Sequence, residues 1–557
     1  MRLTIKNIKK INHYNLFLAI LMATWGSFFI YIWPKMLYFN LNGDLVAGWV
    51  NVWGDFAAHF AYASPFAYRT INDWFISNPV FFYNKFNYPF LTDLISGLLI
   101  RLGFSIPSAF VFPSIIYSIL FIYLYFKLSY KLTGSSFGAY LSVTIFLLSG
   151  GFGFIYFFKN DLGIFLQTLE IPRQYTQMKD PGISFINVIT SELIPQRSFL
   201  MGLPITIFIL LTLNNFLINK FKVKKIKIIL LGLLYGFLPV VHMHSFIALS
   251  LICAFMFLYN IKYYKNLLLF AFTAFIPALI IYLLLFKNSL EASNFFAFYP
   301  GWMANKNEHN VNIFIFWFYN FGLFFPVSLF LYFYKKLYKN YLYTSALFIF
   351  IVMHIFKFQP WVWDNAKLLT YWYLIFCIPI AKELAILYTV INKKTHFLVK
   401  LFKVGLATLL LILLTFSGFL DILYLSNYKK NSYVISSSSD LNFAKNVNKV
   451  ISSGNTVLTA TNHNNVISNH TKGRVLLGFT GWLWSYGINY YKTYNDLQQM
   501  YINPANSLNL YKNYNVKYVV VSGVEESEFK NINSSYFYTN FNLVIDSPNF
   551  KLFRVVY

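Results

Sequence analysis

The sequence predicts an α-helical polytopic membrane protein of about eleven transmembrane helices, followed by an extracytoplasmic C-terminal α/β domain. Three observations predict this class. Apolar runs of about 20 residues, the length of a membrane-spanning helix, recur through most of the chain. Of the 557 residues, 57% are hydrophobic and 21% aromatic, which excludes an ordinary soluble protein. The acidic residues are confined almost entirely to alternate connections and to the tail.

The apolar runs define a predicted membrane domain at residues 1–424. Its spans are expected at 13–33, 107–128, 135–157, 198–218, 226–242, 243–260, 266–286, 312–333, 340–356, 368–390 and 399–424. The long first outer loop, 34–106, contains two aromatic amphipathic stretches, 55–70 and 89–103. We expect both to be helices lying along the membrane surface, and two further spans are the alternative.

Charge gives the helices a predicted orientation. Short Lys clusters, such as the one from Lys220 to Lys227, alternate with loops that carry acids, and basic loops face the cytoplasm. We therefore expect a multi-pass protein of the cell membrane, in contact with its lipids, with the N-terminus inside and the acidic loops outside. The net charge of +26 comes from these clusters, so no nucleic-acid partner is indicated. Cys253 and Cys377 both lie in apolar runs and form no disulfide framework.

The composition changes at about residue 425. Short β-branched runs at 456–461, 474–479, 517–521 and 552–556 are separated by helical stretches near 440–452 and 494–513. This alternation predicts a small α/β domain at 425–557. It would lie outside the cytoplasm because it follows the eleventh span.

Asp55 and His59 form the first candidate for catalysis. They stand four residues apart in the stretch 53–60 and would share one face of a helix. Such a pair can serve as a general base and its orienting partner, with the carboxylate taking a proton from an attacking hydroxyl. An N-cap Asp beside an interfacial His is the alternative.

A second candidate, Glu192, Gln196 and Arg197, precedes the span at 198–218. Arg197 can hold a phosphate through two parallel hydrogen bonds, and Gln196 can bind a sugar hydroxyl. The alternative for Arg197 is a side chain that extends to lipid headgroups.

A third candidate, Trp363, Asp364, Asn365 and Lys367, enters the span at 368–390. The Trp ring offers a stacking face, the Asp and Asn offer polar recognition, and the Lys offers a counter-charge for phosphate. An interfacial aromatic belt with a Lys reaching to the headgroups is the alternative.

Two weaker candidates remain open. His242 and His244, at the junction of two spans, could converge if the backbone turns there; the options are a divalent metal, hydrogen bonding to substrate, or packing. No other cofactor is indicated. Trp482 and Trp484 in the tail could stack on an acceptor sugar or dock the tail domain onto the membrane part.

In its layout over residues 10–260, the chain resembles the GT-C superfamily of integral-membrane glycosyltransferases, which includes protein O-mannosyltransferases and lipid A aminoarabinose transferases. The resemblance rests on Gly54-Asp55 opening a long outer loop after the first span, on Asn87-Tyr88-Pro89-Phe90, and on Arg101-Leu102-Gly103. The motifs at 195–197, 242–244, 363–367 and 481–484 are similar to those of a bacterial subgroup of that superfamily.

The resemblance implies transfer of a hexosyl or pentosyl group, with inversion, from a polyprenyl-phosphate donor to an extracytoplasmic glycan, lipid or protein acceptor. Asp55 takes the position of the catalytic base. Many relatives have a second acid directly after that Asp, where this chain has Phe56. A further acid in the second outer loop is usual, and Glu192 is the candidate for it, with competitors at Asp161, Glu170 and Asp180.

Two other functions compete with transfer. A transporter or flippase for a lipid-linked or anionic solute would place ionisable residues along several spans, and Glu383 is the one acid that lies outside the outer loops and the tail from Asp421. A non-catalytic membrane scaffold would account for the tail but would leave the clustering of polar motifs at the outer ends of the spans unexplained.

Overall fold

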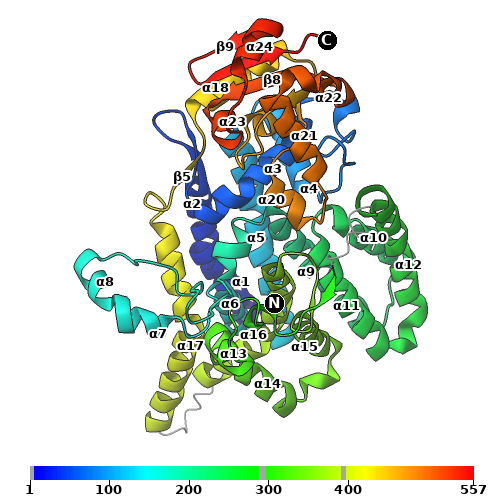
Figure 1. The fold of residues 1–557 in the computed structure, drawn as a ribbon. Helices are drawn as coiled ribbons and strands as arrows, with labels where there is room; N and C mark the ends of the chain where they lie inside the picture. Colours follow the sequence, from blue (N-terminus) through cyan, green and yellow to red (C-terminus); the bar gives the residue numbers. More distant parts are fainter. Residues whose placement is uncertain (1–4, 288–295, 390–396) are drawn as a thin grey trace. The chain divides into compact units, whose positions relative to one another are not determined.

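The computed structural model describes residues 5–287, 296–389 and 397–557, which form two compact units (Figure 1). Within these ranges, unit 1 comprises Met1–Trp33, Ser114–Ile280 and Phe296–Lys430, and unit 2 comprises Pro34–Pro113, Ile281–Phe295 and Asn431–Tyr557. The sequence-based division placed a single boundary after residue 424. The structure instead groups the first long loop with the tail, because strands and a hydrophobic core join the two segments.

Unit 1 holds most of the apolar helices. Among the described residues, six helices are long and apolar enough to cross a membrane, or seven if one bent pair counts as a single span. By helix length and composition, the protein is therefore an integral-membrane protein. The long helices are α1 (Ile5–Leu21) continued by α2 (Ser27–Met36), α5 (Ile106–Thr133), α9 (Arg197–Ile218), α12 (Tyr264–Ile281), α16 (Ala366–Thr389) and α17 (Phe397–Ser426).

The other predicted spans are helical but shorter. They are α6 (Ser136–Leu147), α10 (Lys225–Gly236), α11 (Met243–Tyr259) and α15 (Tyr341–Met353). The predicted span 312–333 is broken into α13 (Ile313–Phe321) and α14 (Phe324–Tyr334), which meet at 96°. The break has a local cause, because Gly322 between them adopts a φ of +53°, outside the helical region. Hydrophobic runs alone do not reveal such a break.

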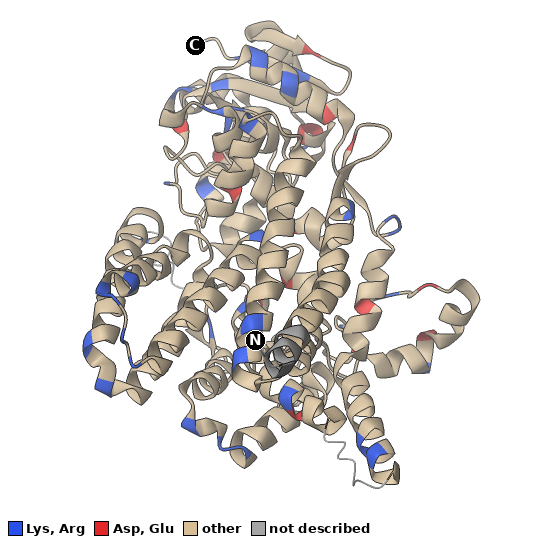
Figure 2. Cartoon of the chain, turned by 180° about the vertical axis from the view of Figure 1, so that it is seen from behind, with Lys and Arg blue, Asp and Glu red and all other residues tan. Residues whose placement is uncertain are grey.

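Helix α16 is the centre of packing in unit 1. It contacts α6, α11, α14, α15 and α17, and its residues from Ala366 to Ala381 are all buried. Basic residues lie mainly at helix ends and in connections (Figure 2), including Lys220, Lys222 and Lys224 between α9 and α10 and Lys335, Lys336 and Lys339 between α14 and α15. The predicted orientation, with basic connections in the cytoplasm, depends on this distribution of Lys and Arg.

Unit 2 contains the α/β fold predicted for the tail. A five-stranded sheet has the order β7-β6-β8-β10-β9, in which β6 runs parallel to β7 and β8 while β10 is antiparallel to β8 and β9. Four strands overlap the predicted runs, and β9 was not predicted. The strands are β6 (Thr456–Leu458), β7 (Arg474–Val475), β8 (Val516–Ser522), β9 (Asn542–Asp546) and β10 (Phe550–Arg554). The larger tail helices are α18 (Ser438–Val450) and α21 (Tyr491–Ile502).

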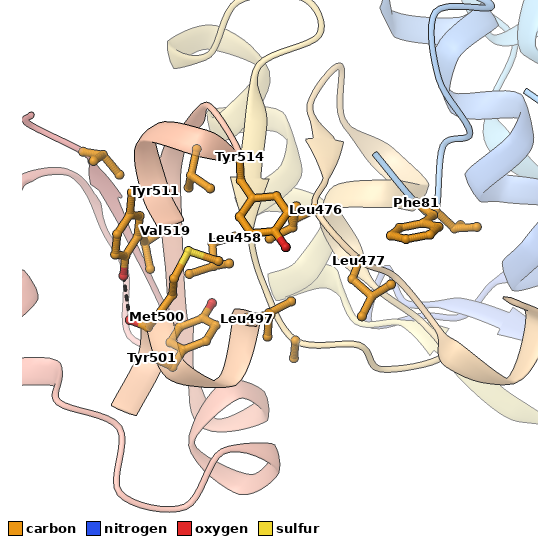
Figure 3. Packing of buried hydrophobic residues seen from close by; sticks show 14 of the residues in the cluster. Phe81, Leu458, Leu476, Leu477, Leu497, Met500, Tyr501, Tyr511, Tyr514 and Val519 are labelled. Atoms are coloured by element: carbon orange, nitrogen blue, oxygen red, sulfur yellow. Dashed lines mark hydrogen bonds between the residues drawn. The ribbon is translucent and has the colours of Figure 1, made fainter. Parts of the chain in front are cut away.

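The first loop and the tail share hydrogen bonds and a core. Strands β1 (Leu37–Phe39) and β2 (Leu45–Ala47) form a small antiparallel sheet with β5 (Tyr433–Ser436). Figure 3 shows Phe81 of the loop beside Leu476 and Leu477 of the tail, in a cluster that continues through Leu458 and Tyr501. Burying this much apolar surface is the main force that holds the two segments in one unit.

The two amphipathic stretches of the loop are helices α3 (Val50–Tyr68) and α4 (Leu91–Arg101). Every residue of α3 from Phe56 to Ala67 is buried, against α4 and the tail helix α19 (Val466–His470) among others. The expectation that α3 presents an apolar face to the membrane is therefore wrong, because protein covers that face. Amphipathic periodicity does not distinguish a lipid surface from a protein one.

Candidate functional site

Asp55 and His59 lie one turn apart on α3, as predicted, but the structure gives His59 a different partner. Its Nδ1 lies 2.9 Å from Oδ1 of Asp93 on α4, and both side chains are buried. Asp55 itself is half-buried. A buried carboxylate that accepts from Nδ1 fixes the orientation of the imidazole ring. Sequence reasoning missed Asp93 because it is 38 residues from Asp55 and belongs to another helix.

Tyr88 completes what we call the Asp55 cluster: Asp55, His59, Tyr88 and Asp93. The Tyr88 ring stacks on Tyr62 with centroids 3.8 Å apart. Burial, followed by the electrostatic influence of Tyr486 and Asp93 and, more weakly, of Asp55, raises the pKa of the Tyr88 hydroxyl well above its usual value. The Tyr88 hydroxyl is therefore neutral and lies within electrostatic range of both acids.

The tail contributes residues next to Asp55. Nε2 of His463 lies 2.8 Å from the carbonyl oxygen of Gly54, and the His463 ring stacks on Trp53 with centroids 4.7 Å apart. The Trp482 ring lies 5.2 Å from the same imidazole. Trp482 thus contacts the histidine that reaches Gly54, the residue before Asp55, whereas Trp484 is half exposed. No sequence pattern marked His463.

Unit 1 brings together motifs that are far apart in the sequence, and we call them the Lys367 cluster: Glu192, His242, His244, Asp364, Lys367 and Tyr371. Thr370 Oγ1, on α16, donates to Glu192 Oε1 at 3.0 Å. Lys367 Nζ lies 3.0 Å from Asp364 Oδ1. The ammonium of Lys367 is also within electrostatic range of Glu192 and of both histidines.

The histidine pair is connected to α16 through a serine. The Tyr371 hydroxyl donates a hydrogen bond to Ser245 Oγ at 2.5 Å, and Ser245 Oγ lies 2.8 Å from His242 Nδ1. The backbone N–H of Ser245 also donates to this nitrogen, which makes Nδ1 an acceptor and places the proton of the neutral ring on Nε2. The rings of His242 and His244 lie 5.4 Å apart.

Glu192 differs chemically from an ordinary acid. It is 2% exposed, and burial raises its pKa to about 8, although Thr370 and Lys367 act in the opposite direction. The carboxyl group is therefore mostly protonated near pH 7. It can then donate a hydrogen bond as well as accept one.

Arg197 and Gln196 stand at the start of α9, beside Glu192 in the chain. The backbone N–H of Gln196 donates to the Glu192 carbonyl oxygen at 3.1 Å. Arg197 is fully buried, and Gln196 is half-buried. Two residues further on, Phe199 lies 5.2 Å from His242 and 6.0 Å from Tyr371 between ring centroids.

Two of the predicted binding residues hold the local loop. Asn365 Nδ2 donates to the carbonyl oxygens of Met353 and Phe356, at 3.0 and 2.7 Å. Trp363 donates its indole N–H to the carbonyl oxygen of Ser184 at 2.9 Å. In the part of the chain that the structure describes, no three His, Cys, Asp or Glu side chains gather as metal ligands.

No family model matches the chain, and no curated protein matches it in sequence. Solved structures with a similar fold do match it. The apo oligosaccharyltransferase of Archaeoglobus fulgidus superposes with a TM-score of 0.51 at 13% identity, covering 92% of this chain and 70% of that one. ArnT from Cupriavidus metallidurans gives a TM-score of 0.47 in the apo state and 0.44 with undecaprenyl phosphate bound. Both ArnT alignments are at 10% identity and cover 97% of each chain.

The superposition on the oligosaccharyltransferase extends over nearly the whole chain, so it concerns both the helical unit and the α/β unit. At this identity it establishes the architecture. The sequence motifs had suggested the same architecture from residues 10–260 alone. The chain therefore has the fold of this oligosaccharyltransferase.

Proposed function

We propose that this protein is an integral-membrane glycosyltransferase that moves a sugar from a polyprenyl-phosphate donor to an acceptor outside the cytoplasm. The observation that carries the proposal is the Lys367 cluster. Three motifs that the sequence marked separately, at 192–197, 242–244 and 364–367, contribute side chains to one buried polar group in a membrane bundle. Buried ionisable residues within such a bundle are costly and mark functional sites.

The proposed reaction is a single displacement with inversion at the anomeric carbon. An acceptor hydroxyl attacks that carbon while Asp55 takes the hydroxyl proton, and the bond from carbon to the phosphate oxygen breaks. The polyprenyl phosphate leaves with the electron pair. His59, held by Asp93, and the neutral Tyr88 hydroxyl position the groups around Asp55.

A polyprenyl phosphate is an anion, and Lys367 and Arg197 in unit 1 offer it positive charge. In a site from which water is excluded, one fixed donor to such a charge is worth about 3 kcal/mol in the barrier. Nε2–H of His242 and the protonated Glu192 add neutral donors, which stabilise an anion without repelling Lys367. The proposed partners are a lipid-linked sugar and a hydroxyl-bearing acceptor.

Asp55→Asn tests the proposal. Mass analysis of lipid that copurifies with the full chain would identify the polyprenyl-phosphate sugar, and turnover of that lipid would then be measured. We expect Asp55→Asn to lower kcat by about 10²–10⁴-fold, because an amide cannot accept the proton. Asp546→Asn, on an exposed strand of the same unit, is the matched control and should keep full turnover.

Equal turnover by Asp55→Asn and the wild type would remove Asp55 from the base role. Movement of the lipid-linked sugar across a vesicle membrane without any transfer would instead identify a flippase.

A further inference from the structure

Unit 2 contains a small cavity that the proposed chemistry does not use. Its volume is about 190 Å³, and it lies beyond the carboxyl ends of the parallel strands β6 and β8. In open α/β sheets, ligands bind beyond this edge. The polar part of its lining consists mainly of Asp440, Asn462, Asn464, Thr459, Ser522 and Glu525.

Internal hydrogen bonds hold several of these polar groups in place. The Glu525 carboxylate accepts from Thr459 Oγ1 and from the Ala460 N–H, both at 2.9 Å, and from Ser522. Asn465 donates to Asn462 Oδ1 at 3.1 Å, which leaves the amide N–H groups of Asn462 as the donors toward a ligand. The cavity therefore presents fixed acceptors and donors together.

Asp440 has one oxygen committed to the fold. Its Oδ2 accepts from the Ser437 N–H at 2.7 Å in the capping box that begins α18. Among the described residues, its Oδ1 receives no hydrogen bond. This oxygen is an acceptor available to a hydroxyl group.

The rest of the lining limits the class of ligand. No Lys or Arg is present among the lining residues, so the cavity does not suit a phosphate or another anion. One wall is aromatic, because Phe443 and Phe550 stack there with centroids 4.5 Å apart. A sugar combines hydroxyl groups with an apolar C–H face, which matches polar groups opposite aromatic rings. The volume is below the roughly 300–1,000 Å³ of drug-sized sites, so it suits one ring.

A single loop lies between the cavity and the backbone beside Asp55. Asn462 and Asn464 line the cavity, and His463 between them contacts the carbonyl oxygen of Gly54. His463 therefore separates a ligand in the cavity from Gly54, the residue before the proposed base.

We propose that this cavity binds one uncharged sugar ring of the acceptor, so that the acceptor is a glycan or glycoconjugate. The ring bound here is not the one that reacts; it holds the acceptor while another hydroxyl is presented to Asp55. That the bound sugar belongs to the acceptor rests on the proposed glycosyl transfer. The binding of a sugar in this cavity does not depend on that transfer.

Saturation-transfer NMR on the full chain in lipid nanodiscs tests the proposal. The probes are the methyl glycosides of glucose, galactose, mannose and N-acetylglucosamine. Val524 lines the cavity and is 38% exposed, so Val524→Phe should fill the cavity without disturbing the core. Val450→Phe is the matched control, because Val450 is 40% exposed and lies outside the lining.

We expect saturation transfer to at least one glycoside with the wild type and with Val450→Phe, and none with Val524→Phe. Asn462→Ala should weaken the same binding about tenfold, the equivalent of one hydrogen bond of about 1.4 kcal/mol. Absence of transfer to all four glycosides, or equal transfer to the wild type and Val524→Phe, would overturn the proposal. Turnover of the lipid-linked sugar is measured separately. Sugar binding without turnover would therefore refute the transferase, and turnover without sugar binding would refute the cavity.

Discussion

At the scale of single residues, the protein places ionisable groups where water cannot reach them. Glu192, Asp93 and Asp364 are all buried, and each has a specific partner: Thr370, His59 and Lys367. Burying such groups costs free energy unless they are paired or neutralised. The chain uses both solutions, because Asp364 is paired with a cation while Glu192 holds its proton.

The raised pKa of Glu192 predicts a pH dependence of stability. Below about pH 4.5, Glu192 is protonated in both the folded and the unfolded chain. Between about pH 4.5 and 8, only the unfolded chain loses this proton, so the free energy of unfolding falls as the pH rises. Glu192→Gln cannot ionise, so we expect it to resemble the wild type at pH 4 and to be more stable at pH 9. The upper bound is about 5 kcal/mol, since each tenfold change in a proton equilibrium is about 1.4 kcal/mol.

Thermal unfolding in detergent at the two pH values checks this expectation. The control is Glu170→Gln, a partly exposed acid that pairs with Lys430. A Glu192→Gln variant whose Tm difference from the wild type is the same at pH 4 and pH 9 would show that Glu192 ionises normally.

The candidate residues were predictable one by one, but their partners were not. Asp55, Glu192, His242 and Lys367 stand out in the sequence because polar groups flank apolar runs. The pairing of His59 with Asp93 depends on how α3 packs on α4, and no local pattern encodes that contact. His463 is hidden in an Asn-rich loop for the same reason, since its role arises from a contact 409 residues away.

At the scale of elements, the contact between α3 and α4 determines the geometry around Asp55. Gly97 on α4 permits this contact, because a Cβ at Gly97 would lie 2.6 Å from the Ala63 carbonyl oxygen and 2.7 Å from Phe66 Cβ. Both are on α3, which carries Asp55 and His59. The positions of His59 and Asp93 therefore depend on the absence of a Cβ at Gly97.

Gly97→Ala should push the two helices apart. We expect a loss of about 1–3 kcal/mol in the free energy of unfolding, the usual cost of overpacking. Gly54→Ala on α3 is the matched control, because a Cβ there meets nothing within 4 Å. It should be neutral or stabilise the helix by about 0.5–1 kcal/mol. Equal stability of the two variants, measured by unfolding in detergent, would show that the helices do not depend on the close approach.

The elements themselves follow from the sequence to different degrees. All eleven apolar runs overlap helices, because burial in lipid or protein demands long hydrophobic segments. The lengths of α6 and α10 and the 96° bend at Gly322 were not predictable, since hydropathy windows average over the backbone conformation of individual residues. The edge strand β9 was missed because it is largely exposed and has a polar residue at each end.

At the scale of the whole molecule, the Lys clusters predict which side each connection faces. Cysteine labelling can test this directly, because the chain contains two cysteines, Cys253 and Cys377, and replacing both with Ser gives a clean background. Lys530→Cys in the tail should react with a membrane-impermeant maleimide in intact cells. Lys224→Cys, in the connection before α10, should react after permeabilisation only.

Both positions are exposed lysines, so differences in intrinsic reactivity are small. Labelling of Lys224→Cys and protection of Lys530→Cys in intact cells would reverse the orientation. The proposed transfer outside the cytoplasm would then be wrong.

The shared core of the first loop and the tail also has a consequence for biosynthesis. Phe66, Val80, Phe81 and Phe86 leave the ribosome early, but Leu476, Leu477 and Leu483, which belong to the same core, follow about four hundred residues later. At roughly 5–20 residues per second, the delay is on the order of 20 to 80 s. During that time the loop exposes aromatic surface, so a chaperone that covers this segment would limit its aggregation.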